Sequence, residues 1–557
     1  MLSYRKLAMR VLGRPLHTGG IDSPRPASQR AAAFALTAAM LITLTAPAFA
    51  ATWRIEDGDI TVKAGETEGT NKVSQGTNKD VVDTNTIITN QNKDTASSHT
   101  VTIEANDKND KVEVTLKDVN IDASSRNEAA VSVTGSGNTT IKLDGDNHLT
   151  GGISDNGSYG LSGISSSGSL TISGGETDSL TAQGGSGTDG SGGRGIFSKD
   201  LTISGGTVNA NGGDGKNGSG GSGITSLGSL TISGGTVNAA GGDGTNSSDG
   251  GDGITNNRGV TISSGGTVTA KGGSGEDGGR GISSFGGVTI SSGGTVTATG
   301  GNSTGSDGSG GNGISSTSTT ISGGTVTANG GSGNSSGGNG IRSFDVAISG
   351  GTVTANGGDG KDGYGGDGIH SNDIDLSGSL ELTAKAGSPN GKALSQKGSE
   401  LVLDTIKDKL GPGAKVTTTD ADGKVIKQVS VPRPVEPEKP VTPEESSSSS
   451  DGGSAAPSAS VSSLPGLTVT DKDGQRISYT STQSGNTLTV CVGRLTASLH
   501  VSLATLRQLR AEGIETIAFQ TILCSTTLSL DELLAMGGED AEAVLTHRFT
   551  DSSLTVG

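Results

Sequence analysis

The sequence predicts an all-β chain, in which a parallel β-helix with about 28–30 residues per rung is followed by a small α+β domain. Three observations lead to this fold class. Aromatic residues make up only 2% of the 557 residues, too few for an ordinary globular core, whereas glycine occurs 97 times. The dipeptide Gly-Ile recurs at a nearly constant interval. Between its occurrences, apolar and polar residues alternate in register from one repeat to the next.

The N-terminus has the pattern of a secretory signal peptide. Six basic residues precede the apolar run "AAAFALTAAMLITLTAPAFA", which ends in an Ala-x-Ala site at Ala50. The alternative is a membrane anchor, because the run reaches about the lower spanning length. Pro47 and the small residues beside it favour cleavage after Ala50. We therefore expect a secreted or cell-surface protein with no membrane span after cleavage.

The charge of the chain narrows the classes of partner. The formal net charge is −17. Binding of nucleic acid through its phosphates requires a basic surface, so no nucleic-acid partner is expected. An acidic exterior favours solubility outside the cell and leaves carboxylates available for divalent cations.

A repeat unit begins at each of eight Gly-Ile dipeptides, which are 27 to 32 residues apart. Each is followed by an apolar-polar-apolar segment such as "LTISGG", then by "TVNA" or "TVTA", then by a glycine-rich stretch of variable length. Alternation with a period of two and β-branched residues indicates half-buried strands. The repeated isoleucines are Ile164, Ile196, Ile224, Ile254, Ile282, Ile314, Ile341 and Ile369.

Each unit thus holds three short strands, near Gly-Ile, Leu-Thr-Ile and Thr-Val-Thr. None can fold alone, but stacked units can pair each strand with its counterpart about 4.8 Å away. Val208 and Ala210 illustrate the positions expected to point inward, and only Thr319 interrupts the apolar column of the second strand. Glycines are expected at the corners, and the variable stretch is expected to protrude as a loop. The alternative is a disordered glycine-rich chain.

The segment before the regular repeats carries a family resemblance. Its strand-like pieces "VTLKDVNID", "AAVSV" and "TTIKLDGDNHLTGG", together with the "LTISGGTV" units, resemble the bacterial secreted carbohydrate-binding domain family, which is built on a pectate-lyase-like right-handed β-helix. The resemblance covers roughly residues 53–420. It implies a right-handed helix and non-catalytic binding of plant-type polysaccharides, with acidic polymers and calcium among the options.

The composition changes after Val431. A Pro/Glu/Ser-rich segment has the character of an extended linker. In the region after it, strand-like segments accompany two expected helices, "SLATLRQLRAEG" ending at Gly513 and "SLDELLAMGG" with caps at Ser529 and Gly537. The predicted parts are a signal peptide (1–50), the β-helix (51–430), the linker (431–463) and a small α+β domain (464–557).

Two cysteines occur, and both lie in the predicted C-terminal domain. In a secreted protein, Cys491 and Cys524 are expected to form a disulfide. The alternative is a pair of buried thiols, because "TVCVG" and "TILCS" have the character of core strands.

The sequence offers little for catalysis. Its histidines are scattered and form no His-x-x-x-His pair. A polysaccharide lyase on this fold would use Arg or Lys beside calcium, and Arg194, Arg280 and Arg342 each lie near the start of a rung. A single arginine in such a repeat is usually solvated surface, so we expect no enzyme.

Aspartates recur in the glycine-rich stretches, where they suggest an edge that coordinates calcium. Hard oxygen ligands on adjacent turns suit this ion. The alternative is that these residues only form turns, which Asp, Asn and Ser tolerate well. The candidate ligands are Asp214, Asp243, Asp252, Asp359 and Asp367.

A second polar array is expected to face outward from the third strand. Its hydroxyls and amides could hydrogen-bond an extended glycan, or could be only a β-favouring surface. The array also resembles ice-binding faces. Its members are Thr207, Asn209, Thr236, Asn238, Thr267, Thr269, Thr295, Thr297, Thr325, Thr327, Thr352 and Thr354.

These expectations combine into one functional hypothesis. The chain is predicted to be a secreted, non-catalytic carbohydrate-binding protein that takes plant-type or acidic polysaccharide on the β-helix surface. Sugars often stack on aromatic rings, and the repeats contain few, so polar ladders or bridging calcium would supply most of the affinity. The alternatives are an adhesin or spacer that binds protein or cell wall, and a polysaccharide lyase.

Overall fold

The computed structural model describes residues 51–432 except 156 and 292, and residues 467–556 except 472–474, 478, 485, 493, 495, 522–524, 537–541 and 548–551. The predicted signal peptide and linker lie outside the described residues, apart from residues 431 and 432 at the start of the linker. The chain divides into two compact units, one up to Pro437 and one from Glu438, and each is described by itself. Among the helices described, none is long and apolar enough to cross a membrane.

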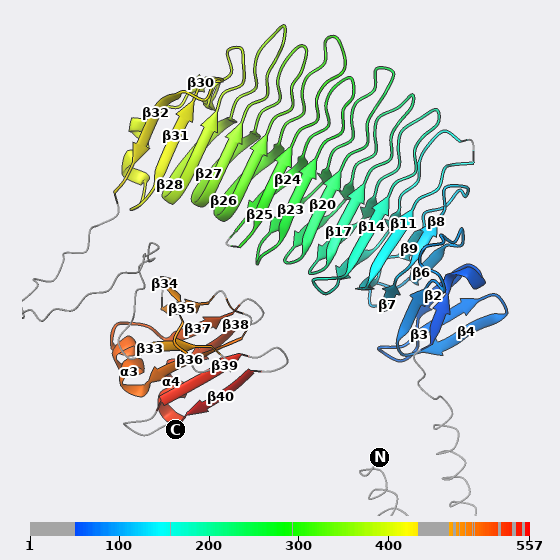
Figure 1. The fold of residues 1–557 in the computed structure, drawn as a ribbon, viewed down its shortest axis with the longest axis horizontal. Coiled ribbons are helices and arrows are strands. Elements are labelled where there is room, and N and C mark those ends of the chain that lie inside the picture. Colours follow the sequence, from blue (N-terminus) through cyan, green and yellow to red (C-terminus); the bar gives the residue numbers. More distant parts are fainter. Residues whose placement is uncertain are drawn as a thin grey trace, which may run out of the picture. The chain divides into compact units, whose positions relative to one another are not determined.

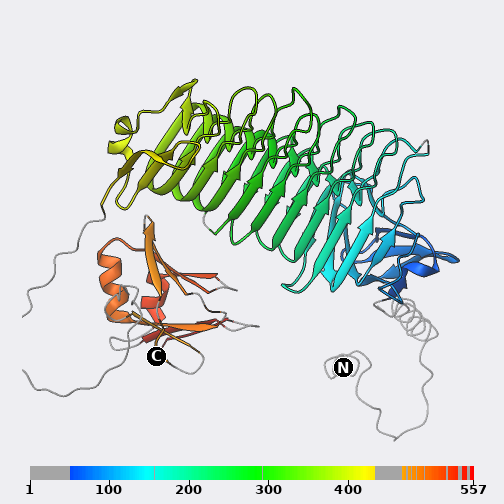
Figure 2. The same cartoon turned by 45° about the horizontal axis from the view of Figure 1, so that its top comes forward.

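The first unit is a parallel β-helix, as the repeats predict. Figures 1 and 2 show its strands stacked side by side, with long loops projecting in a row along one side. Three parallel ladders run along it and are called the first, second and third ladder. The first contains β2 (Ile60–Ala64), β6 (Val101–Ala105), β9 (Val131–Gly135), β12 (Ile164–Ser166), β15 (Ile196–Ser198), β18 (Ile224–Ser226), β21 (Ile254–Asn256), the starts of β24 (Ile282–Ile290), β26 (Ile314–Asn329), β27 (Ile341–Asn356) and β28 (Ile369–Lys385), and β29 (Leu394–Gln396).

The second ladder uses parts of the long strands β24, β26, β27 and β28, and the third uses parts of β26, β27 and β28. The second contains β1 (Thr52–Arg54), β5 (Thr86–Thr89), β7 (Lys111–Lys117), β10 (Asn138–Asp144), β13 (Ser169–Ser173), β16 (Asp200–Ile203), β19 (Ser229–Ile232), β22 (Gly259–Ile262) and then the later part of β24 and the middle parts of β26, β27 and β28. The third contains β8 (Asn120–Asp122), β11 (Asp146–Thr150), β14 (Ser179–Gln183), β17 (Thr207–Asn211), β20 (Thr236–Ala240), β23 (Thr267–Lys271), β25 (Thr295–Thr299), the ends of β26, β27 and β28, and β31 (Lys415–Thr419).

The pairing follows the sequence repeat residue by residue. Ile164 pairs with Ile196, and Val208 pairs with Val237. These four side chains are fully buried and belong to one continuous core that is almost entirely aliphatic. Burying an isoleucine contributes about 1.5–3 kcal/mol, so a column of them supplies much of the stability that aromatic residues supply elsewhere.

Thr319, the exception in the apolar column, is fully buried. Its hydroxyl contacts the Ser343 hydroxyl at 2.6 Å and the Ser316 hydroxyl at 2.8 Å, so the interruption is satisfied by hydrogen bonds. Ser316 and Ser343 belong to a row of inward serines and one asparagine that the sequence analysis did not identify. Their side chains hydrogen-bond backbone groups at the corner between the first and second ladders, as Ser198 Oγ does by donating to Asp200 O at 2.5 Å.

The glycine-rich stretches project as loops, as expected, and their bases are regularly hydrogen-bonded. Each consists of two legs, an outgoing leg after the third ladder and a returning leg before the next Gly-Ile. Gly213 N donates to Gly193 O, Gly221 N to Gly213 O, and Gly242 N to Gly221 O, each at 2.8 Å. Hydrogen bonds therefore zigzag between outgoing and returning legs from rung to rung. The variation in length falls at the loop tips, beyond these legs.

Glycine has two different roles in this unit. Between the second and third ladders, one glycine of most pairs has positive φ, for example +77° at Gly206 and +74° at Gly235, which glycine adopts at little cost. In the legs the reason is close approach. A Cβ on Gly221 would lie 1.9 Å from Gly193 O, and Gly221 does not have positive φ.

Both ends of the β-helix carry antiparallel additions that the repeat does not predict. At the start these are β3 (Asn71–Gln75), β4 (Asn78–Asp83) and a short 3₁₀ helix, η1 (Ile55–Asp57). At the end they are β30 (Ser399–Glu400), η2 (Leu403–Thr405), η3 (Lys407–Lys409) and β32 (Val425–Ser430). Such elements cover the terminal rungs, whose edges would otherwise be open to pairing.

The second unit is a small α+β fold around its own core. One sheet contains β33 (Leu467–Thr470), β36 (Ala497–Ser502), β39 (Glu542–His547) and β40 (Ser552–Val556). The other contains β34 (Thr480–Ser484), β35 (Thr487–Cys491), β37 (Thr516–Gln520) and β38 (Ser525–Ser529). The expected helices are α3 (Leu503–Ala511) and α4 (Leu530–Met536). Ser502 caps α3 by accepting a hydrogen bond from Thr505 N at 3.2 Å. The expected N-cap of α4, Ser529, is the last residue of β38 and directly precedes the helix. The expected C-cap, Gly537, lies outside the described residues.

Candidate functional site

The twelve candidate glycan-binding residues form two rows on the outer side of the third ladder, here called the threonine face. The first row pairs Thr207 with Thr236 and continues to Thr352, and the second begins with Asn209 and Asn238 and ends at Thr354. Every one of these side chains is exposed or half-buried, while the valine and alanine beside them are buried. Alternation along each strand positions them, because successive side chains point to opposite sides.

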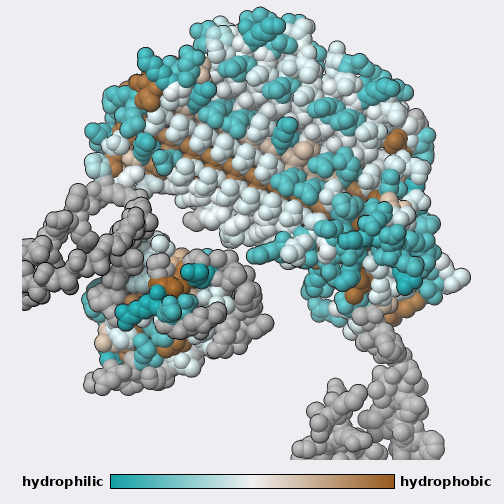
Figure 3. Space-filling model, in the orientation of Figure 1, coloured by the Kyte–Doolittle hydropathy of each residue, from teal (hydrophilic) through white to brown (hydrophobic). Residues whose placement is uncertain are grey.

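The spacing on this face is regular in both directions. Equivalent residues on adjacent rungs are about 4.8 Å apart, and residues two apart on one strand are separated by about 6.6 Å. Asn238 Nδ2 donates to Asn209 Oδ1 at 2.8 Å, so part of the array is already hydrogen-bonded to itself. Figure 3 shows that this side of the β-helix carries mainly side chains of intermediate and hydrophilic character, crossed by a narrow hydrophobic stripe along the axis.

A third outward row flanks the two expected ones and was missed in the sequence analysis. Asn356 Nδ2 donates to Asn329 Oδ1 at 2.7 Å within it. The second ladder carries a further missed row of outward threonines. The signal for both was present, because the third row lies two residues after a predicted outward column and the second-ladder threonines lie between two aligned apolar columns. The third row is Asn211, Ala240, Lys271, Thr299, Asn329 and Asn356, and the second-ladder row is Thr171, Thr202, Thr231, Thr261, Thr289 and Thr320.

The five candidate calcium ligands lie on two different legs. Asp214, Asp243 and Asp359 belong to outgoing legs, whereas Asp252 and Asp367 belong to returning legs. Asp214 and Asp243 are on adjacent rungs, but Asp359 lies several rungs further along. Within the described ranges no group of three or more His, Cys, Asp or Glu side chains is close enough to hold a metal ion.

The aspartates instead share one structural contact. Asp243 N donates to Asp214 Oδ1 at 2.9 Å, and Ser274 N donates to Asp243 Oδ1 at 2.7 Å. On the returning leg, Arg280 N donates to Asp252 Oδ1 at 2.7 Å. Each carboxylate thus accepts from the backbone of the next rung, which satisfies an N–H that the glycine ladder leaves open. Calcium binding stays a prediction.

The three arginines considered for a lyase do not converge on one point. Arg194 lies over the Phe197 ring, with its guanidinium carbon 5.2 Å from the ring centroid. Arg280 and Arg342 are in other rungs, at the starts of β24 and β27. Arg342 lines a pocket of about 270 Å³ together with Phe344 and His370. It also lines a neighbouring pocket of about 300 Å³ with Arg280.

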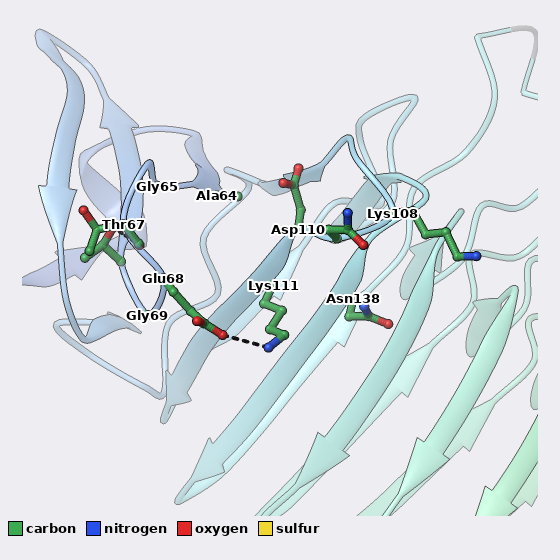
Figure 4. Close-up of a pocket in the computed structure, with 11 residues that line it drawn as sticks. Ala64, Gly65, Thr67, Glu68, Gly69, Lys108, Asp110, Lys111 and Asn138 are labelled. Carbon is green, nitrogen blue, oxygen red and sulfur yellow. Dashed lines mark hydrogen bonds and ion pairs between the residues drawn. The ribbon is translucent and has the colours of Figure 1, made fainter.

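A larger hollow of about 450 Å³ lies at the N-terminal end of the β-helix (Figure 4). The turn between β2 and β3 faces the turn that precedes β7 across it. Glu68 from the first turn points toward Lys111, and Lys111 Nζ donates to Glu68 Oε1 at 2.8 Å. This hydrogen bond lowers the pKa of Glu68. Both partners are exposed, so the ion pair contributes little to stability and acts as a contact between the two turns.

The second unit holds one buried histidine and one described cysteine. The rings of His547 and Phe519 are 4.8 Å apart, and burial lowers the pKa of His547. Cys491 Sγ donates to Gln520 Oε1 at 3.4 Å, and burial raises the pKa of this thiol. Cys524 lies outside the described residues, so the expected disulfide stays a prediction.

Comparison with known proteins agrees with the repeated architecture. The model of the beta helix repeat family matches residues 201–223, 230–254, 320–340 and 346–373. The chain carries beta helix repeats. These segments contain second- and third-ladder strands together with the glycine legs, so the family model and the hydrogen-bonded rungs describe the same unit. No curated protein and no solved structure matches the chain.

Proposed function

We propose that this protein is a secreted, non-catalytic polysaccharide-binding protein and that its β-helix holds an extended glycan on the threonine face. The observation that carries the proposal is the register of twelve outward hydroxyl and amide side chains on six consecutive rungs. The resemblance to the carbohydrate-binding family supports the same class of ligand.

The chemistry of the face suits a polymer rich in hydroxyl groups. A threonine hydroxyl donates one hydrogen bond and accepts others, and an asparagine amide does both at fixed positions. Each hydrogen bond exchanged with water contributes only about 0.5–1.5 kcal/mol. Many equivalent contacts along one chain then add up, so we expect affinity to rise with the length of the glycan.

Several features support binding without catalysis. A general acid or base must lie within hydrogen-bond reach of the bond that it acts on. The threonine face offers hydroxyls and amides, whose pKa values lie far from neutrality. Among the described residues, the lyase-type arginines lie in separate rungs and away from this face.

The proposal is tested by removing hydroxyls from the centre of the face. Thr297→Val with Thr327→Val keeps two β-branched side chains but removes two hydroxyls. We expect binding to an immobilised plant polysaccharide to fall by about tenfold, because two hydrogen bonds are lost.

The matched control is Thr261→Val with Thr289→Val, which makes the same change on the second ladder. Equal binding by both double variants and the unmodified protein would refute the threonine face as the site. Absence of binding to any glycan by the unmodified protein would favour the adhesin or spacer instead. Release of unsaturated uronide from an acidic polymer would establish a lyase.

A further inference from the structure

Two large aromatic side chains are exposed at one corner of the β-helix. Phe285 is 76% exposed and Phe344 is 63% exposed, in a chain with few aromatic residues. Each directly follows an inward serine, and those serines, Ser284 and Ser343, both pair with Ser316 in the rung between them. The two rings therefore occupy the same corner position two rungs apart, which corresponds to about 9.6 Å.

The corner position between the two rings is polar. Thr317 fills it, and Thr317 Oγ1 donates to Phe285 O at 2.5 Å. Asn372 follows at the same position in the next rung and lines the pocket beside Phe344. A pyranose in an extended chain advances by about one rung spacing, so two rings at this separation match alternate sugars of a chain that runs along the helix axis.

One pocket adjoins Phe344, and Arg342 links it to a second pocket. The pocket of about 270 Å³ contains Ser315, Phe344 and His370, and the pocket of about 300 Å³ contains Arg280. Arg342 lines both and lies between them. The two pockets and the two rings are here called the arginine groove.

The arginine groove is lined by two arginines and one carboxylate, Asp277. Over the described part of the chain, neither Arg280 nor Arg342 forms an ion pair, although Arg126 elsewhere in the β-helix pairs with Asp59 at 2.7 Å. Asp277 of the groove, and Asp367, which lies beside the groove residue His370, have other hydrogen-bond partners. Asp277 Oδ1 accepts from Ser309 N at 2.6 Å, and Asp367 contacts His370 Nδ1 at 2.7 Å through its second oxygen.

Asp367 Oδ1 is also engaged, because it accepts from Lys392 N at 2.7 Å. The guanidinium groups of Arg280 and Arg342 are the cationic groups that these two pockets offer to a ligand without an ion pair among the described residues. A guanidinium forms two parallel hydrogen bonds to a carboxylate or sulfate group, which a lysine ammonium cannot do. The protein has a net charge of −17, so most of its surface repels anions. Two arginines in one groove make the groove a more favourable place for an anionic ligand than the surrounding acidic surface.

We infer that the arginine groove is a second glycan site, which binds a saccharide bearing a carboxylate or sulfate group directly through Arg342 and stacks its sugar rings on Phe285 and Phe344. The aromatic face suits the apolar side of a pyranose, and the guanidinium takes the anionic substituent. The inference rests on the proposed function only for the class of ligand, because the residues are separate from the threonine face. It requires no metal ion.

The experiment measures calorimetric affinity of the full chain, with EDTA present throughout, for a uronate oligosaccharide, a sulfated oligosaccharide and a neutral one of equal length. We expect anionic ligands to bind and Arg342→Gln to weaken them by roughly tenfold to a hundredfold. Phe344→Ala is expected to weaken the same ligands. Arg342→Lys, which keeps the charge but loses the paired geometry, should be intermediate.

The matched control is Arg54→Gln, which removes an exposed arginine at the start of the β-helix without touching the groove. Unchanged affinity for the anionic ligands in Arg342→Gln, or an equal loss in Arg54→Gln, would overturn the inference. The uronate and sulfate arms tell which anionic group is preferred.

Neutral-glycan binding separates this inference from the proposed function. If Thr297→Val with Thr327→Val abolishes binding of the neutral ligand while Arg342→Gln leaves anionic binding unchanged, the groove is refuted and the threonine face stands. The reverse pattern refutes the threonine face and supports the groove.

Discussion

The zigzag of glycine hydrogen bonds predicts that Gly221→Ala destabilises the β-helix severely. The added Cβ would lie 1.9 Å from Gly193 O and 2.6 Å from Gly193 C, whereas ordinary van der Waals contact begins at 3.4 Å. Both neighbours are backbone atoms, so no side chain can rotate away. Gly221 also donates to Gly213 O and accepts from Gly242 N, each at 2.8 Å.

Relief of this overlap requires the rungs to move apart, which breaks hydrogen bonds on both sides of Gly221. We expect a loss of about 3–5 kcal/mol in the free energy of unfolding, the range of severe overpacking combined with broken backbone hydrogen bonds. The measurement is chemical unfolding followed by far-ultraviolet circular dichroism. A change in the slope as well as in the midpoint would indicate that only part of the stack unfolds.

Gly259→Ala is the matched control. Its added Cβ would meet only Gly287 O, at 3.5 Å, and its backbone does not have positive φ. We expect this variant to unfold within about 1 kcal/mol of the unmodified protein. If Gly221→Ala and Gly259→Ala unfold at the same denaturant concentration, close approach is not the reason for the glycines in the legs.

Three further predictions concern other parts of the molecule. Asp243→Asn keeps the side-chain acceptor for Ser274 N and should leave the melting temperature unchanged, whereas Asp243→Ala should lower the free energy of unfolding by about 1 kcal/mol. If EDTA lowers the melting temperature of the unmodified protein but not that of Asp243→Asn, Asp243 is instead a calcium ligand. A Cys491–Cys524 disulfide predicts no thiol titration in denaturant without reductant, and two titrating thiols would exclude it. Burial lowers the pKa of His547 in the folded state, so the unfolded state binds more protons. The C-terminal unit should therefore lose stability as the pH falls below about 6.5. His547→Gln should remove this pH dependence, and an unchanged pH profile in that variant would contradict the prediction.

Much of the architecture could be predicted from local patterns. The Gly-Ile interval and the alternation in each strand correctly identified three ladders, with Ile164 paired to Ile196 as expected. They also placed the threonine rows on the outside. The antiparallel strands at the two ends could not be predicted in this way, because they occur once each and follow no repeat.

The aspartates show the limit of residue types as a guide to chemistry. Asp214 and Asp243 suit calcium and turns equally well in the sequence. The structure shows that Asp214 accepts from the backbone of the next rung, a contact between residues 29 positions apart. Its chemistry depends on the neighbouring rung, which a motif in one rung does not describe.

The sequence by itself determined which side chains face inward and which face outward, because the period of two is a local property of every strand. Only the tertiary structure decided which residues of different rungs come together. Gly221 is required by the carbonyl of Gly193, and Arg342 meets Phe344 and His370 at one pocket. These contacts depend on the register and loop lengths of stacked rungs, and both are set by packing and hydrogen bonding between segments almost thirty residues apart.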